Sequence, residues 1–129
     1  MKKKLIIILV LSIIIFFLVY KLTSKPEQAK ENYLKDNKEY NDIDSNNIVS
    51  IEVNKYSEAG VDSNLIIDKN EIRKMYNKLS NIKYGEETDM ACDDNSTIYI
   101  INFNDDSKKK IEIECDWIII GKKRYMIVK

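Results

Sequence analysis

The chain begins with a long, almost uninterrupted apolar segment. Residues 5–20 read LIIILVLSIIIFFLVY, in which only Ser12 is polar, and a serine hydroxyl can bond back to the preceding helical turn. At 1.5 Å per residue this run extends about 24 Å, and Leu22 with a snorkelling Lys21 lengthens it towards the roughly 30 Å of a bilayer core. The pattern predicts a transmembrane helix within residues 1–22.

The same segment could be an uncleaved signal anchor or a cleaved signal peptide. Lysines at positions 2 to 4 form a suitable n-region, but sixteen apolar residues are long for an h-region and no A-x-A site follows. We therefore predict a signal anchor, with a cleaved signal peptide as the alternative. The lysine cluster directly before the helix favours a cytoplasmic N-terminus, although four lysines follow within about fifteen residues. The rest of this cell-membrane protein is then expected to be extracytoplasmic.

Residues 23–47 are polar and rich in charge. Pro26 suits the first turn of a helix, and Glu31 precedes Lys35 by four residues, which is a favourable helical pair. We predict a polar stalk, compatible with a helix over residues 26–41 that has no face to bury. The alternative is an amphipathic first helix of the domain, because some of the few apolar residues fall near one side. The five apolar residues are Ala29, Tyr33, Leu34, Tyr40 and Ile43.

Two strands and then a helix are predicted at the start of the body, in the order β-β-α, with the second strand at the apolar run 65–67. Residues 48–54, IVSIEVN, alternate apolar and polar side chains with the period of a half-buried strand, and a polar loop separates them from a short apolar run at 65–67. Asp68 and Glu71 have the spacing of a capping box. The pattern predicts one amphipathic helix over about 69–82, capped by Asp68. Its apolar stripe is Ile72, Met75, Tyr76, Leu79 and Ile82.

Only strand patterns follow the helix. Residues 97–103, TIYIINF, are apolar on both faces, which suits a central strand. The turn at 104–107 joins them to the alternating residues 110–115 in one hairpin. A second hairpin is predicted from residues 117–120 and 125–128, joined through Gly121.

These elements predict an α+β protein with an N-terminal transmembrane helix, a polar stalk and a small antiparallel sheet covered by one amphipathic helix. A single helix of this length is marginal in water and must pack on the sheet. The predicted domains are 1–22, the signal anchor; 23–47, the stalk; and 48–129, an extracytoplasmic α+β domain expected to fold without the anchor.

Composition removes several function classes. The first 25 residues hold five lysines and no acid, whereas the other 104 carry a net charge of −5 from 16 basic and 21 acidic residues. A net-negative body argues against nucleic acid, which needs a concentrated basic surface. The chain has no histidine. Histidine-dependent triads and dyads, histidine-ligated zinc and the imidazole pH switch are therefore excluded.

Cys92 and Cys115 are the only cysteines. Both lie in the part expected outside the cytoplasm, where disulfides persist, so we predict a bridge that pins the loop at 85–96 to the sheet. The alternative is two separate thiols, one of them a small buried hydrophobe. A catalytic thiol is disfavoured because Asp93 and Asp94 would raise its pKa and no histidine can activate it.

No catalytic, cofactor or metal site is predicted. The loop at 86–94 is the most acidic stretch, but it lacks the spacing and the glycine of a calcium loop, so a solvated loop is favoured over a cation site. Met90 with Cys92 would make only a weak copper pair. Paired carboxylates for glycoside cleavage are equally unspecific in so small a domain.

Charged and aromatic residues near the C-terminus give two further expectations. Residues 108–129 carry seven cations and three acids. They could orient the domain over an anionic membrane or wall polymer, but solvated hairpin turns are the simpler interpretation. The aromatic residues Tyr99, Phe103, Trp117 and Tyr125 are predicted to be core.

The chain is rich in lysine, isoleucine and asparagine and has two arginines and three glycines, the usage of an AT-rich genome. With its anchor and stalk it resembles the small signal-anchored extracytoplasmic proteins of unknown function of low-GC Gram-positive bacteria, in architecture only. We expect a non-catalytic binding domain whose partner is a protein, peptide or envelope polymer. The alternatives are an immunity or accessory protein that sequesters a peptide or toxin, and a small envelope enzyme.

Overall fold

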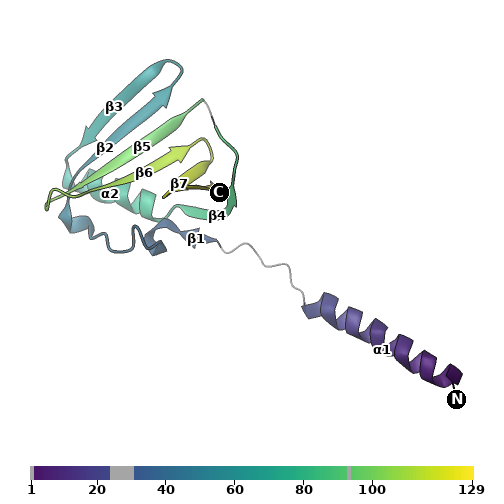
Figure 1. Cartoon of the computed structure of the whole chain (residues 1–129). Coiled ribbons are helices and arrows are strands. Elements are labelled where there is room, and N and C mark those ends of the chain that lie inside the picture. Colours follow the sequence, from purple (N-terminus) through teal and green to yellow (C-terminus); the bar gives the residue numbers. More distant parts are fainter. Residues whose placement is uncertain (1, 24–30, 93) are drawn as a thin grey trace.

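The structure is a computed structural model that describes residues 2–23, 31–92 and 94–129 (Figure 1). Its α-helices are α1 (Lys2–Thr23) and α2 (Lys69–Ser80), and its short 3-10 helices are η1 (Leu34–Asp36) and η2 (Ser45–Asn47). The strands are β1 (Asn32–Tyr33), β2 (Ile48–Ser57), β3 (Gly60–Ile66), β4 (Lys83–Thr88), β5 (Ser96–Phe103), β6 (Lys108–Glu114), β7 (Trp117–Ile120) and β8 (Lys123–Ile127).

The predicted apolar helix is present as α1, which is long and apolar enough to cross a membrane. None of its residues is buried against the rest of the described chain. The hydroxyl of Ser12, the one polar side chain in the apolar run, donates to the Leu9 carbonyl at 2.9 Å. A helix of this kind fits either a membrane anchor or a signal sequence.

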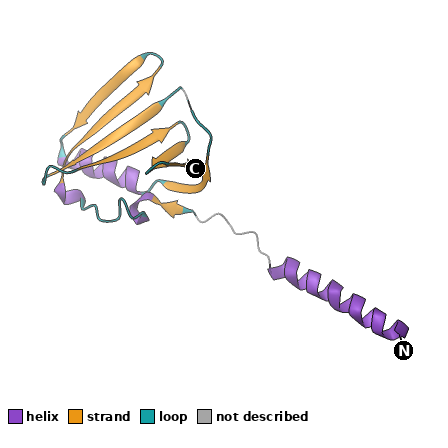
Figure 2. Ribbon diagram, viewed as in Figure 1, coloured by secondary structure: helices purple, strands orange, loops and turns teal. Residues whose placement is uncertain are grey.

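All eight strands join one antiparallel sheet in the order β1-β4-β8-β7-β6-β5-β2-β3. Neighbouring strands in the C-terminal half are hairpin partners, and α2 lies across one side of the sheet (Figures 1 and 2). The predicted α+β class, with one antiparallel sheet and one amphipathic helix, is confirmed.

Helix α2 forms where the apolar stripe predicts it. The Asp68 carboxylate accepts hydrogen bonds from the backbone N–H groups of Asn70 and Glu71, at 2.9 and 3.0 Å, so it caps the helix as expected. Ile72 and Leu79 are buried against the sheet, and Ile82, just beyond the helix, packs on the same core. The buried core consists of Leu34, Tyr40, Ile48, Ile51, Val53, Ile66, Ile72, Leu79, Tyr84, Ile101, Ile111, Ile118 and Ile120.

The predicted stalk over residues 23–47 is wrong for residues 31–47, which pack on the domain. Leu34 is 1% exposed and Tyr40 is 5% exposed. The Leu34 N–H donates to the Ile82 carbonyl at 2.9 Å, and the Tyr40 hydroxyl donates to the Lys110 carbonyl at 2.9 Å. Burial raises the pKa of Tyr40 to about 12. The folded domain therefore includes residues before Ile48.

The helix considered over residues 26–41 is also absent from its described part, 31–41, which contains β1 and η1; residues 26–30 lie outside the described residues. Tyr33, Leu34 and Tyr40 are each held by a partner distant in sequence. Periodicity can report only contacts repeated along one face, so isolated anchors of this kind look like a polar linker.

Besides β1, the structure contains a strand that the pattern does not predict, and it extends others beyond their predicted bounds. Residues 83–88, expected to lead into an acidic loop, form β4, which pairs with β1 and β8. Only Tyr84 is buried in it, so its sequence lacks alternation. The polar loop expected after Asn54 is a hairpin that continues β2 to Ser57 and begins β3 at Gly60. Its tip is polar because both of its faces are exposed.

Leu79→Ala should destabilise the domain by about 2 to 5 kcal/mol, because it removes a side chain that is 1% exposed beneath α2. Lys78→Ala, one position away and exposed, should change the free energy of unfolding by less than about 0.5 kcal/mol. Urea unfolding of the full chain in detergent, followed by the fluorescence of Trp117, measures both. Equal effects would mean that α2 is not packed on the sheet.

Leu34→Ala tests whether the segment before β2 belongs to the fold. Loss of its buried side chain should also cost about 2 to 5 kcal/mol, while Lys38→Ala, an exposed neighbour in the same segment, should be nearly silent. The same unfolding measurement applies. If Leu34→Ala were as silent as Lys38→Ala, residues 31–47 would be a stalk after all.

Candidate functional site

The two faces of the sheet differ in what covers them. Successive side chains of a strand point to opposite faces, and Ile51, Ile101, Ile111 and Ile118 turn inward to the core beneath α2. We call that side the helix face and the opposite side the open face. Apolar side chains of the open face are Tyr56, Val61, Leu65, Ile98, Ile100, Trp117, Ile119 and Met126. Polar ones are Ser50, Glu52, Asn54, Ser63, Ser96, Asn102, Lys108, Lys110, Glu112, Glu114 and Arg124.

Apolar side chains concentrate in the middle of the open face. Ile98 of β5 and Ile119 of β7 lie on either side of Glu112 of β6 in one row of the sheet. Trp117 faces Met126 across the β7–β8 pair, and Met126 is 47% exposed. None of these four apolar residues belongs to the buried core or packs against it. They form two apolar groups on this face, on either side of the charged side chains of β6.

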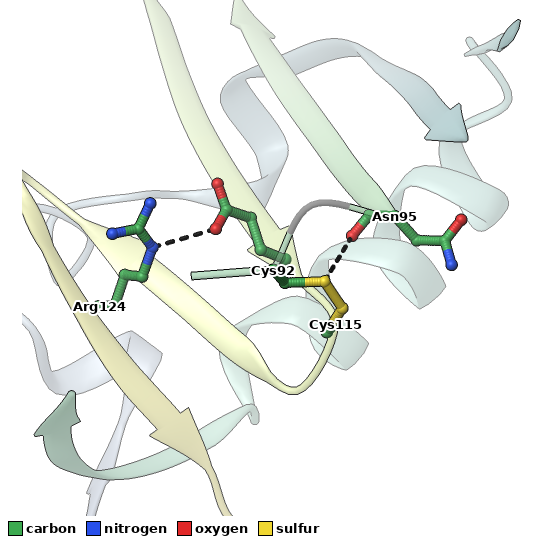
Figure 3. The surroundings of a disulfide bond; sticks show 5 residues. Cys92, Asn95, Cys115 and Arg124 are labelled. Carbon is green, nitrogen blue, oxygen red and sulfur yellow. Dashed lines mark hydrogen bonds and ion pairs between the residues drawn. A yellow bond between two sulfur atoms is a disulfide. The ribbon is translucent and has the colours of Figure 1, made fainter. Parts of the chain in front are cut away.

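The charged side chains of the open face are tied to one another. Lys110 contacts Glu112 at 3.1 Å along β6, and Arg124 of β8 reaches across β7 to Glu114 at 3.0 Å (Figure 3). The apolar side chains beside these pairs are half-buried, except for the exposed Met126. A partner on this face would therefore meet apolar side chains beside charged groups that are already neutralised in ion pairs.

Asn102 adds a polar cluster at the other end of β5. Its amide nitrogen donates to the hydroxyl of Ser50 at 3.0 Å and to the carboxylate of Glu52 at 2.9 Å. Its amide oxygen is buried without a hydrogen-bond partner in the described part of the chain. An unsatisfied buried acceptor is costly, so this carbonyl is a point at which a donor from water or from a bound partner would be stabilising.

The predicted disulfide joins Cys92 and Cys115, whose Cα atoms are 6.2 Å apart. Cys115 is the first residue of the two-residue turn between β6 and β7, with φ of 47°, and its N–H donates to the Asn95 carbonyl at 3.1 Å. The chain between β4 and β5 must pass β8, β7 and β6 to reach its place in the sheet. The bridge fastens this crossover to the sheet at the border of the open face (Figure 3).

The acidic stretch at 86–94 is not one loop. Glu86 and Glu87 belong to β4, and Glu87 contacts Lys123 at 3.4 Å. Asp93 lies outside the described residues. No three histidine, cysteine, aspartate or glutamate side chains of residues 2–23, 31–92 and 94–129 group closely enough to hold a metal ion. Cys92 of the considered copper pair is engaged in the disulfide.

The C-terminal cations do not form one basic patch. Five of the seven between 108 and 129 contact a carboxylate: Lys109, Lys110, Lys123, Arg124 and Lys129. Lys109 donates to the Glu39 carbonyl and to the Asp42 carboxylate, the latter at 2.7 Å. The hydrogen bond from Lys109 to Asp42 lowers the pKa of the Asp42 carboxyl. Local pairing of this kind weakens long-range attraction to an anionic surface.

The aromatic residues divide between the two faces. Tyr99, Phe103 and Tyr125 pack against the core as predicted. The prediction is wrong for Trp117, which lies on the open face. Its neighbour Ile118 is fully buried on the helix face, so strict alternation turns Trp117 outward. The sequence WIII has no polar residue to show which parity faces the core.

A polar hollow lies on the helix face between the C-terminal half of α2 and the β2–β3 hairpin, with a volume of about 410 Å³. Lys55, Asp62, Lys78 and Tyr99 are among its lining residues, and burial raises the pKa of Tyr99. No hydrogen bond or ion pair joins these four side chains to one another in the described structure. An acid–base pair is therefore not assembled there.

No family model, curated protein or solved structure matches this chain.

Replacing both cysteines with alanine should lower the free energy of unfolding. A bridge that closes a separation of 23 residues contributes about 3 kcal/mol through the entropy of the unfolded chain. Urea unfolding with and without reductant measures this for the native protein, and the reduced protein should match Cys92→Ala/Cys115→Ala. The double variant should not respond to reductant, and an unchanged midpoint in the native protein would contradict a structural bridge.

Proposed function

We propose that this is a single-pass membrane protein that presents a non-catalytic binding domain on the outer side of the cell membrane. α1 is the anchor, with its N-terminus in the cytoplasm, and the domain captures a protein or peptide partner on the open face of the sheet.

One observation carries the proposal. The solvated face of an antiparallel sheet is usually polar, yet here it carries the half-buried Ile98, Ile100, Trp117 and Ile119 and the exposed Met126, none of which belongs to the core. Apolar side chains left outside the core and bordered by polar ones are characteristic of interaction surfaces. Tryptophan and methionine are also enriched at protein interfaces.

The chemistry of the face favours a protein or peptide over an anionic envelope polymer. Its apolar residues are mainly branched aliphatic side chains, which gain from contact with other apolar side chains. Arg124 and Lys110, the cations beside them, are already held by Glu114 and Glu112. A polyanion would have to displace these carboxylates before it could bind.

Two features support the placement of the domain outside the cytoplasm. The cluster of lysines at positions 2 to 4 precedes α1 directly, as in helices with a cytoplasmic N-terminus. The Cys92–Cys115 bridge is typical of oxidising compartments. A small envelope enzyme fits less well, because the side chains brought together on the open face form ion pairs rather than a nucleophile, a base and an orienting group.

Site-specific photo-crosslinking in intact cells tests the proposal. Benzoylphenylalanine at Ile119 should give a covalent adduct, because this position lies at the centre of the open face. The matched control carries the same group at Lys74, which is exposed on α2, and should give none. Proteinase added outside protoplasts should degrade the adduct. Adducts of equal yield at both positions would refute the open face as the binding surface, and a protected adduct would refute the orientation.

A further inference from the structure

One border of the sheet ends in a long strand that is open to solvent. The sheet begins with the two-residue β1 and ends with the seven-residue β3. Within the described residues no strand lies beyond β3, and Val61 and Leu65 are 60% and 57% exposed. Edge strands are commonly protected by lysine, proline or a bulge. β3 reads GVDSNLI and has none of them, with Asp62 as its one charge.

The direction of the backbone groups of β3 follows from its turn. Ser57 and Gly60 close a two-residue hairpin loop and therefore form a hydrogen-bonded pair. Every second residue from Gly60 then directs its N–H and C=O towards β2. The residues between, Val61, Ser63 and Leu65, direct theirs away from the sheet.

We propose that two copies of this chain join through antiparallel pairing of β3 with β3, about a two-fold axis at Ser63. Ser63 is the midpoint of the strand, so this register pairs all seven residues. Ser63 of one copy then lies opposite Ser63 of the other, and Val61 of each copy lies opposite Leu65 of the other. All the outward backbone groups are thereby brought into hydrogen-bonded pairs. The remaining interior pair, Asp62 with Asn64, places a carboxylate opposite an amide.

The self-complementarity of the strand selects a second copy as the partner. Val61 and Leu65 both project on the open face, so the pairing gives apolar contact on that side. On the helix face, Asp62 meets the amide of Asn64 and like charges are kept apart. A symmetric partner therefore satisfies backbone, apolar and charged groups at once.

Neighbouring registers are worse. A two-fold axis at Asp62 places the two Asp62 carboxylates opposite each other, which is destabilising, and pairs only five residues. An axis at Asn64 also pairs only five residues and places Asp62 opposite Ile66. An axis between two residues would set outward backbone groups against inward ones, so no ladder could form.

The dimer would extend the sheet across the axis, with the two open faces adjoining on one side. Val61 and Leu65 of both copies would connect them. This inference depends only on the edge strand and not on the binding function proposed above, since the dimer would form whether or not the open faces bind another protein.

Cysteine cross-linking of the full chain in native membranes tests the dimer and its register. Hydrogen-bonded antiparallel neighbours have Cα atoms about 5.5 Å apart, within the range of a disulfide. Ser63→Cys should therefore form a covalent dimer on mild oxidation, whereas Ser57→Cys, exposed on the adjacent strand, should not. Val61→Cys alone should stay monomeric but should cross-link when co-expressed with Leu65→Cys.

A proline variant tests the pairing without a new thiol. The Ser63 N–H points outward, so Ser63→Pro removes donors to the second copy and leaves the β2–β3 ladder intact, as proline is tolerated in edge strands. Sedimentation of the full chain in detergent should change from dimer to monomer while the Cys92–Cys115 bridge still forms. A covalent dimer no more abundant for Ser63→Cys than for Ser57→Cys would overturn the proposal. So would a Ser63→Cys adduct to a different protein, or a dimer that survives Ser63→Pro.

Discussion

The structure depends on one amphipathic helix packing on one face of a wide sheet. Ile72 and Leu79 of α2 meet Ile51, Ile101 and Ile118 in the same core. A helix of twelve residues is about 18 Å long, whereas eight strands at roughly 4.8 Å span about twice that. α2 therefore cannot cover even one face alone, and the opposite face is left without a helix.

The segment before β2 completes the cover that α2 cannot provide. Leu34 and Tyr40 join the core beside the helix. The backbone N–H of Leu34 donates to the Ile82 carbonyl, and the side-chain hydroxyl of Tyr40 donates to the Lys110 carbonyl. The segment adds little regular structure, but it contacts β4 through Asn37 and Tyr84 and β6 through Tyr40 and Lys110. Both of these covering elements lie on the helix face, and the open face has no helix over it.

The borders of the sheet are secured in different ways. At the turn between β6 and β7, the Cys92–Cys115 bridge fastens the crossover that leads from β4 to β5. At the β1 end the strand is only two residues long and offers little edge. β3 has neither device, and its outward groups at Val61, Ser63 and Leu65 match a second copy of themselves. The open face and the open edge meet at these residues.

The sequence by itself determined every feature that repeats along the chain or depends on neighbours. The apolar run of α1, the stripe and the Asp68 cap of α2, and the two C-terminal hairpins are local patterns of side-chain period and turn chemistry. The pairing of the two cysteines also followed, because a chain with two cysteines allows only one bridge.

Tertiary structure decided the features that leave no repeating pattern in the sequence. Leu34 and Tyr40 became core, and Lys83–Thr88 became a strand, through partners far away in sequence. The pattern of TIYIINF indicated two apolar faces, but Ile98 and Ile100 stay outside the core because neither helix of the described residues packs on their side of the sheet. In WIII, the register of β7 against β6 turned Ile118 inward and Trp117 outward. Whether a residue is buried depends on which elements pack against it, and the side chain's own chemistry does not determine this.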